Sequence, residues 1–259
     1  MGQNIVLTGI VLSAVPVGEY DRRITILTKE RGKISAFARG ARRPGNPLIA
    51  AGSPFSFGQF EAYEGRSSYT VVKADISNYF RELTEDLENT HYGFYFLEMA
   101  NYYTRENADE IHMLKLLYQS LRALESKRLN NRLIRRIFEL KTLVINGDYP
   151  NVFSCLKCKK EEHLSWFHIE SGGTLCTECG KKVSALPIDN STLYTMQYII
   201  TSSIEKLYTF VVTELVLENL EKIIDSYLES CMDQKFHSLQ VLKENQGFAV
   251  QMIKKNDFL

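Results

Sequence analysis

The chain has 259 residues, of which 44% are hydrophobic and 24% charged, and its 31 basic residues balance 31 acidic ones. These values are ordinary for a globular protein and exclude wholesale disorder and a fibrous repeat. No apolar run approaches the ~20 residues of a membrane span and the N-terminus lacks the basic region of a secretory signal, so we expect a cytoplasmic protein with no membrane association.

The first 80 residues are predicted to form β-structure, because apolar residues there are either concentrated or alternate with polar ones. The five predicted strands are Ile5–Val17, Arg23–Leu27, Lys33–Arg39, Phe55–Ala62 with a bulge near Gly58, and Tyr69–Ile76. The polar segment Gly40–Ser53 is predicted as a loop. Five short strands favour a small closed barrel such as the OB-fold, and the pattern alone also fits a five-stranded sandwich or an SH3-like barrel.

A helical period follows Phe80. The predicted helices are Asp86–Tyr103, Asp109–Ser126, Leu129–Asn146, and two more between Asp189 and Met232 with a break near Thr209. The tail from Asp233 to Leu259 is polar and weakly patterned. We therefore predict an α+β protein. Its domains are an OB-fold barrel at 1–80, a helical domain at 81–150 and 188–259 (the latter including the tail), and a cysteine-bearing module inserted at 151–187.

Two Cys-x-x-Cys pairs lie in that module: Cys155 with Cys158, and Cys176 with Cys179. Seventeen residues separate the pairs, which is the spacing of a four-cysteine zinc ribbon. Four thiolates complete a tetrahedron around one ion and leave no open position, so the predicted zinc is structural. Two disulfides are the alternative, which an intracellular location disfavours.

Catalytic motifs are missing from the sequence. His168-Ile169-Glu170 ahead of Cys176 is similar to a zinc-deaminase signature, but Leu175 replaces its proline and the intervening stretch is too short for two helices. The sequence has no phosphate-binding loop, nucleophile elbow or His-Glu-x-x-His helix. We expect no enzymatic activity, and turnover of labelled DNA would reveal the alternative, a nuclease or deaminase.

Basic residues are concentrated between Arg22 and Arg43, where eight stand against the single acidic Glu30. On a barrel this segment would cover strands two and three and the next loop, the face on which OB-folds bind single strands. The alternative is a solvated charged face. The predicted DNA-binding residues are Arg22, Arg23, Lys33, Phe37, Arg39, Arg42 and Arg43.

The order of several segments resembles the bacterial DNA repair protein RecO family. The segments are Thr8–Leu12, Gly18–Arg22, Gly32–Ile34, Ala38–Pro44, and Arg136–Lys141 leading into Cys155-x-x-Cys158. The resemblance covers about residues 5–200. It departs from the family at Gly147-Asp148-Tyr149-Pro150, where a Gly-Tyr-x-Pro turn is usual.

The resemblance implies a recombination mediator in the bacterial cytoplasm, associated with the nucleoid. It implies binding of single- and double-stranded DNA and annealing of complementary strands. It also implies partnership with RecR and with single-stranded-DNA-binding protein, so that RecA recombinase can load. A zinc-ribbon regulator or scaffold without annealing activity is the alternative function.

The helix Leu129–Asn146 carries a second group of cations, Arg132, Arg135 and Arg136. We expect them to form a second cationic surface that extends the DNA path or receives the acidic C-terminal tail of single-stranded-DNA-binding protein. The alternative is a structural role, with Arg136 paired to Glu139 three residues later.

Overall fold

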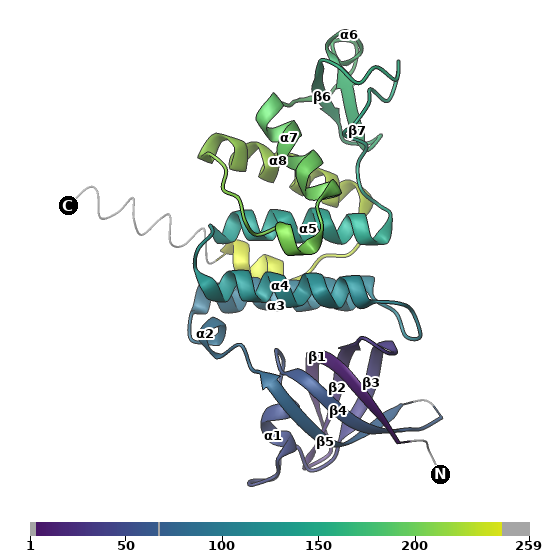
Figure 1. Ribbon diagram of the computed structural model, residues 1–259, viewed down its shortest axis with the longest axis vertical. Coiled ribbons are helices and arrows are strands. Elements are labelled where there is room, and N and C mark those ends of the chain that lie inside the picture. The colour runs from purple at the N-terminus through teal and green to yellow at the C-terminus, as the bar shows by residue number, and fades with distance from the viewer. Residues whose placement is uncertain (1–3, 67, 245–259) are drawn as a thin grey trace, which may run out of the picture. The chain divides into compact units, whose positions relative to one another are not determined.

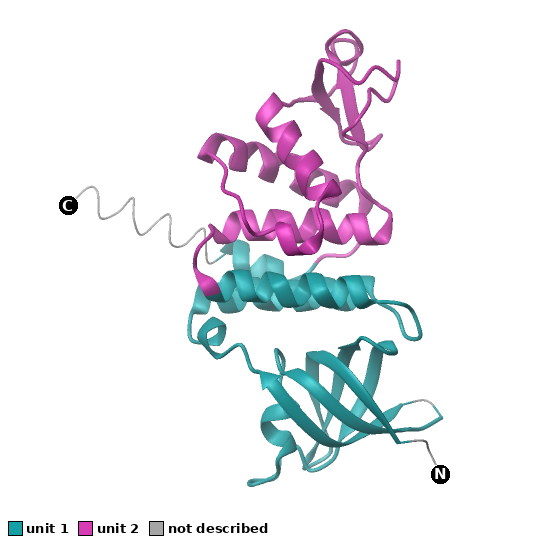
Figure 2. Ribbon diagram, in the orientation of Figure 1, with its two compact units in different colours: residues 1–125, 236–259 teal, residues 126–235 magenta. Residues whose placement is uncertain are grey.

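The structure, a computed structural model, describes residues 4–66 and 68–244 (Figure 1). The chain divides into two units, residues 1–125 with 236–259 and residues 126–235 (Figure 2). No helix in the described ranges is both long enough and apolar enough to cross a membrane.

A closed five-stranded barrel opens the first unit, with the strand order β1-β2-β3-β5-β4. The pairing of β3 with β5 is parallel and the other pairings are antiparallel. This order confirms the predicted OB-fold and excludes the sandwich. The strands are β1 (Asn4–Val17), β2 (Asp21–Thr28), β3 (Gly32–Ala38), β4 (Phe57–Glu64) and β5 (Tyr69–Asn78).

Strict alternation explains why the strands close. Ile24, Ile26, Ile34 and Ala36 point inward and are almost fully buried, while the residues between them face outward. A register shift between Phe57 and Gly58 in β4 confirms the predicted bulge. The predicted loop 40–53 is wrong in one part, because it contains a one-turn helix, α1 (Leu48–Ala51), which is too short to show a helical period.

Helices complete the first unit: α2 (Arg81–Thr84), α3 (Leu87–Tyr103) and α4 (Ile111–Ser126), with residues 237–244 also helical. The segment between α3 and α4 extends the barrel, because Lys33 N donates to Arg105 O at 2.9 Å and Asn107 N donates to Arg31 O at 2.9 Å. These contacts fix the β2–β3 hairpin against the helical part of the same unit.

The second unit holds the cysteine module between helices. Its helices are α5 (Asn131–Asn146), α6 (Thr177–Gly180), α7 (Asn190–Thr201), the 3-10 turn η1 (Ile204–Lys206) and α8 (Glu214–Cys231). Its three-stranded sheet has the order β7-β6-β8. The strands are β6 (Leu164–His168), β7 (Gly173–Cys176) and β8 (Leu186–Pro187). The predicted break near Thr209 is confirmed, since it lies between η1 and α8.

Candidate metal centre and nucleic-acid interface

The four module cysteines converge on one point, with all their sulfurs within 4.8 Å of one another. Cys158 Sγ and Cys176 Sγ are 3.7 Å apart. A tetrahedral zinc site with Zn–S bonds of about 2.3 Å requires sulfur–sulfur separations of about 3.8 Å, whereas a disulfide requires about 2 Å. The arrangement fits a tetrahedral cation better than it fits two disulfides.

Local structure positions these sulfurs. In the first knuckle, Cys155 N donates to Lys160 O at 2.7 Å and Lys159 N donates to Cys155 O at 2.9 Å, which closes a tight turn around the first pair. In the second, Cys176 ends β7 and Cys179 lies on α6. The antiparallel β6–β7 hairpin brings the two knuckles together.

The thiols do not ionise alike. Burial tends to raise the pKa of Cys155, but backbone N–H groups of Cys158, Cys176 and Lys157 outweigh it and lower the pKa to about 6. Burial and the neighbouring sulfurs raise the pKa of Cys179 to about 12. Four clustered thiolates repel one another, so a divalent cation is the chemistry that lets all four ionise together.

The outer face of β2 and β3 carries part of the predicted DNA-binding set. Arg23 and Phe37 are direct partners across the two strands. Arg23 Nε donates to Ser35 Oγ at 3.0 Å, and the Phe37 side chain is half-buried. A cation and an aromatic ring are thus presented side by side on one surface.

The loops at one end of this face add two more arginines. Arg42 N donates to Tyr20 O at 2.9 Å, and the Arg42 guanidinium donates to Gly18 O at 3.2 Å. The Arg43 guanidinium lies 4.6 Å from the centre of the Tyr20 ring. Tyr20 is 39% exposed and belongs to this surface, although its place in the sequence, ahead of the basic run, gave only a weak signal.

We call Arg23, Phe37, Arg39, Arg42 and Arg43 the barrel patch. Its four arginines are exposed. Within the described ranges, no acidic side chain forms an ion pair with any of the four. The patch therefore keeps its positive charge, as binding of a polyanion requires.

Two other residues of the predicted DNA-binding set bind backbone carbonyls of the chain itself. The Arg22 guanidinium donates to Ile49 O at 3.1 Å and to Gly52 O at 3.3 Å, at the C-terminal end of α1. Lys33 Nζ donates to Asn101 O near the end of α3, and burial lowers the pKa of Lys33. Both cations bind carbonyls at the C-terminal end of a helix, where main-chain donors are scarce.

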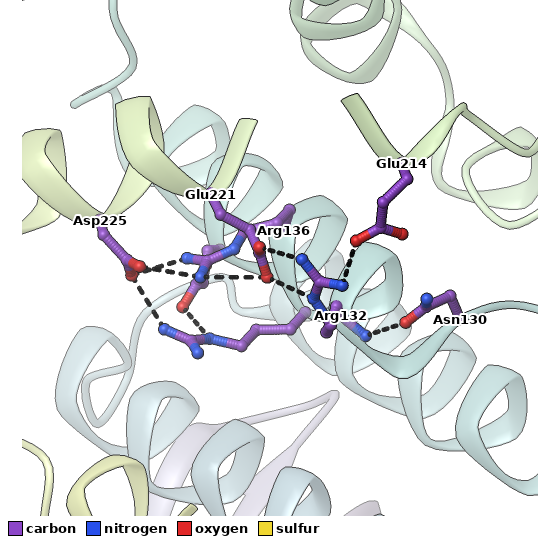
Figure 3. Close-up of polar contacts among 8 residues, drawn as sticks. Asn130, Arg132, Arg136, Glu214, Glu221 and Asp225 are labelled. Atoms are coloured by element: carbon purple, nitrogen blue, oxygen red, sulfur yellow. Dashed lines mark hydrogen bonds and ion pairs between the residues drawn. The ribbon is translucent and has the colours of Figure 1, made fainter. Parts of the chain in front are cut away.

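The predicted second cationic surface is wrong. Arg135 and Arg136 are only 3% and 2% exposed, and both guanidinium groups bind Glu139 and Asp225 (Figure 3). Arg136 donates to Glu139 Oε2 at 2.8 Å and to Asp225 Oδ1 at 2.7 Å. The alternative structural role, with Arg136 paired to Glu139, is confirmed.

Arg132 lies at the rim of the same cluster. Its guanidinium binds Glu221 and Glu214 of α8, and its side chain is 34% exposed (Figure 3). Three guanidinium groups therefore meet four carboxylates, so the cluster carries no net positive charge and joins α5 to α8. Sequence reasoning missed this because three of the four acidic partners lie on α8, about 80–90 residues further along the chain.

Comparisons with known proteins agree with this architecture. The family model for the Recombination protein O C terminal matches residues 84–240, and that for the Recombination protein O N terminal matches residues 1–80. The chain is 33% identical to DNA repair protein RecO of Acetivibrio thermocellus, over 91% of this chain and 95% of that protein. It is 32% identical to DNA repair protein RecO of Alkaliphilus metalliredigens, over 91% and 97%. With the Bacillus subtilis protein of the same name it shares 28% identity, over 85% and 87%. The chain belongs to the RecO family of DNA repair proteins.

Proposed function

We propose that this chain is a recombination mediator without enzymatic activity that binds single- and double-stranded DNA through the barrel patch and anneals complementary strands. The observation that carries the proposal is the group of four exposed arginines without acidic partners in the described ranges, set around Phe37 and Tyr20. Cations track phosphates and aromatic rings stack on bases, which is how OB-folds hold single strands.

Annealing by such a surface needs no covalent chemistry. The arginines neutralise phosphates, so two polyanions can approach, and base pairing supplies the free energy. Because phosphates carry no sequence information, binding through this surface is independent of sequence. Base pairing, and not the protein, then determines which strands anneal.

The experiment measures binding to labelled oligo(dT) and to a duplex at several salt concentrations. If the patch neutralises about four phosphates, log K falls with log salt with a slope of roughly −3 on single strands. The double variant Arg39→Glu with Arg43→Glu should weaken binding to both DNAs and flatten this slope.

The matched control is Lys159→Glu with Lys160→Glu, which reverses two exposed lysines of the cysteine module. It should leave DNA affinity unchanged. The reverse result, with loss of affinity in the module variant and none in the barrel variant, would favour the zinc-ribbon regulator instead.

The partners extend the same proposal. We propose that the chain acts at the bacterial nucleoid with RecR and with strands coated by single-stranded-DNA-binding protein, so that RecA recombinase can load. The test is annealing of complementary strands precoated with single-stranded-DNA-binding protein. Annealing of naked strands without annealing of coated ones would contradict the mediator role.

We further propose one zinc ion per chain, held by Cys155, Cys158, Cys176 and Cys179. The convergence of the four sulfurs supports it. Such an ion closes the module and has no position for a substrate. Metal analysis of the purified protein should give one zinc per chain, and Cys155→Ser should release it with only an indirect effect on DNA binding.

A further inference from the structure

The parallel ladder between β3 and β5 is short. It contains three pairs, Ala36 with Tyr69, Phe37 with Thr70 and Ala38 with Val71. Strand β3 ends at Ala38, whereas β5 runs on to Asn78. The β4–β5 register shifts at Val72, which has no partner in β4. From Lys73 onward, β5 has β4 on one edge and, among the described residues, no strand on the other.

A turn takes the chain away from that edge. Gly40 has a φ of 67°, and its N–H donates to Asp21 Oδ1 at 2.7 Å, which fixes the new direction. The chain then runs through the loop to α1, which lies beside β5 (Figure 1). The space that a longer β3 would fill is left between this loop and β5.

A groove of about 380 Å³ occupies that space. Residues 70–74 of β5 line one side, and Arg39, Asn46, Pro47 and Leu48 line the other. Within the described ranges, no hydrogen bond joins the backbone of residues 72–74 to the loop or to α1. This part of β5 is an open strand edge that borders a preformed groove.

The lining of the groove indicates what it would hold. Leu48 and Val71 give it an apolar floor, and Val72 is 45% exposed. Arg39 and Lys73 stand at its rim, and of these two only Lys73 has an acidic neighbour in the described ranges, Glu61 at 3.3 Å. An extended peptide with alternating acidic and apolar side chains matches both the floor and the cations.

Nucleic acid fits this groove less well than a peptide. None of its described lining residues is aromatic, so it offers no ring on which a base could stack. A strand edge presents N–H and C=O groups alternately, and phosphates can accept from the first but cannot donate to the second. A peptide backbone satisfies both groups.

We propose that residues 72–74 of β5, together with Arg39, form a docking edge for an extended acidic segment of a partner protein. The segment adds to β5 where β3 stops and so continues its ladder. This docking edge is a different surface from the barrel patch, and Arg39 is the one residue that the two surfaces share.

The experiment uses the full chain and a fluorescent heptapeptide of alternating Asp and Val residues. Two further peptides carry N-methyl groups on the Asp residues in one case and on the Val residues in the other. A strand that adds to an edge uses alternate N–H groups, so one methylated peptide should bind at least about tenfold more weakly and the other should bind normally. The backbone amide resonances of residues 70–74 should shift on binding.

Protein variants separate the two surfaces. Lys73→Glu should weaken peptide binding and leave oligo(dT) binding unchanged. Arg23→Glu should weaken oligo(dT) binding and leave peptide binding unchanged. Equal binding of both methylated peptides would show that the peptide is held by charge attraction and not by backbone hydrogen bonds, and it would overturn the proposal. Absence of saturable peptide binding would overturn it too, as would loss of oligo(dT) binding in Lys73→Glu, which would assign the groove to DNA. Loss of DNA binding in Arg23→Glu tests the barrel patch independently.

Discussion

Arginine takes two opposite roles in this chain, and the neighbours of each guanidinium decide which. Arg136 is 2% exposed and bound to Glu139 and Asp225, whereas Arg39 and Arg43 are exposed and have no acidic partner in the described part of the chain. A buried guanidinium requires carboxylates around it, since desolvation of an unpaired charge is prohibitive. The arginines of α5 are structural, and those of the barrel are available to a ligand.

Glu139→Gln tests the buried cluster. Glu139 is fully buried and binds both Arg135 and Arg136, so loss of its charge leaves two buried cations with too few anions. The expected cost is about 3–5 kcal/mol in the free energy of unfolding, measured with urea. The control is Glu214→Gln, which removes a 59% exposed partner of Arg132 and should cost less than about 1 kcal/mol. Equal costs would contradict this description.

Asp189, at the start of α7, stabilises the folded state to an extent that depends on pH. Its Oδ1 accepts from Ser191 N at 2.9 Å and from Thr192 N at 3.0 Å, and its Oδ2 accepts from Asn219. Burial tends to raise the pKa of Asp189, but hydrogen bonds outweigh it and lower the pKa, and the largest contribution is the bond that Thr192 Oγ1 donates to Oδ2. A lowered pKa in the folded state means that the stabilisation is complete above the unfolded pKa and is lost as pH falls through the folded one.

Two substitutions of Asp189 separate the cap from its charge. Asp189→Ala removes both and should cost about 1 kcal/mol at neutral pH. Asp189→Asn keeps a capping acceptor and should cost less at neutral pH, and the difference from the unchanged chain should shrink at acid pH, below the unfolded pKa of about 3.9. Urea unfolding at the two pH values measures this. An unchanged difference at acid pH would show that the charge contributes nothing.

At the scale of elements, the sequence predicts most of the strands and long helices to within two residues. Alternation in β2 and β3 and the apolar stripe of α5 are strong signals because each element buries one face. The helix α1 was missed because a single turn has no measurable period. The roles of Arg22 and Lys33 were missed because their partners are backbone carbonyls, which leave no trace in the residue types.

Lys141 shows the same kind of contact between helices. From α5, its Nζ donates to Ile199 O at 3.2 Å, to Ile200 O at 2.9 Å and to Ser202 O at 2.7 Å, and so caps the C-terminal end of α7. Lys141→Met should leave these carbonyls without a donor and cost about 1–3 kcal/mol. Hydrogen exchange should accelerate in the last turn of α7. The control Lys222→Met removes an exposed lysine from α8 and should leave that exchange rate unchanged.

At the scale of the whole molecule, the division into two units predicts the effect of removing the proposed zinc. The four cysteines all belong to residues 126–235, and the barrel belongs to the other unit. The binding energy of a structural zinc contributes directly to the folding of its own module. A strong chelator should therefore destabilise residues 126–235 and leave hydrogen-exchange protection in β1–β5 intact. Simultaneous loss of protection in both units would contradict the division.

The β2–β3 hairpin has an evolutionary consequence. Gly32 has a φ of 64°, and a Cβ there would collide with Arg105 O and lie 2.8 Å from Ala108 O. A side chain at this position can be tolerated only if residues 105–108 retract, which would break the hydrogen bond between Lys33 N and Arg105 O. Across relatives, position 32 and the connection after α3 should therefore change together or not at all. Relatives in which residue 32 is not glycine should therefore also have a connection of different length after α3.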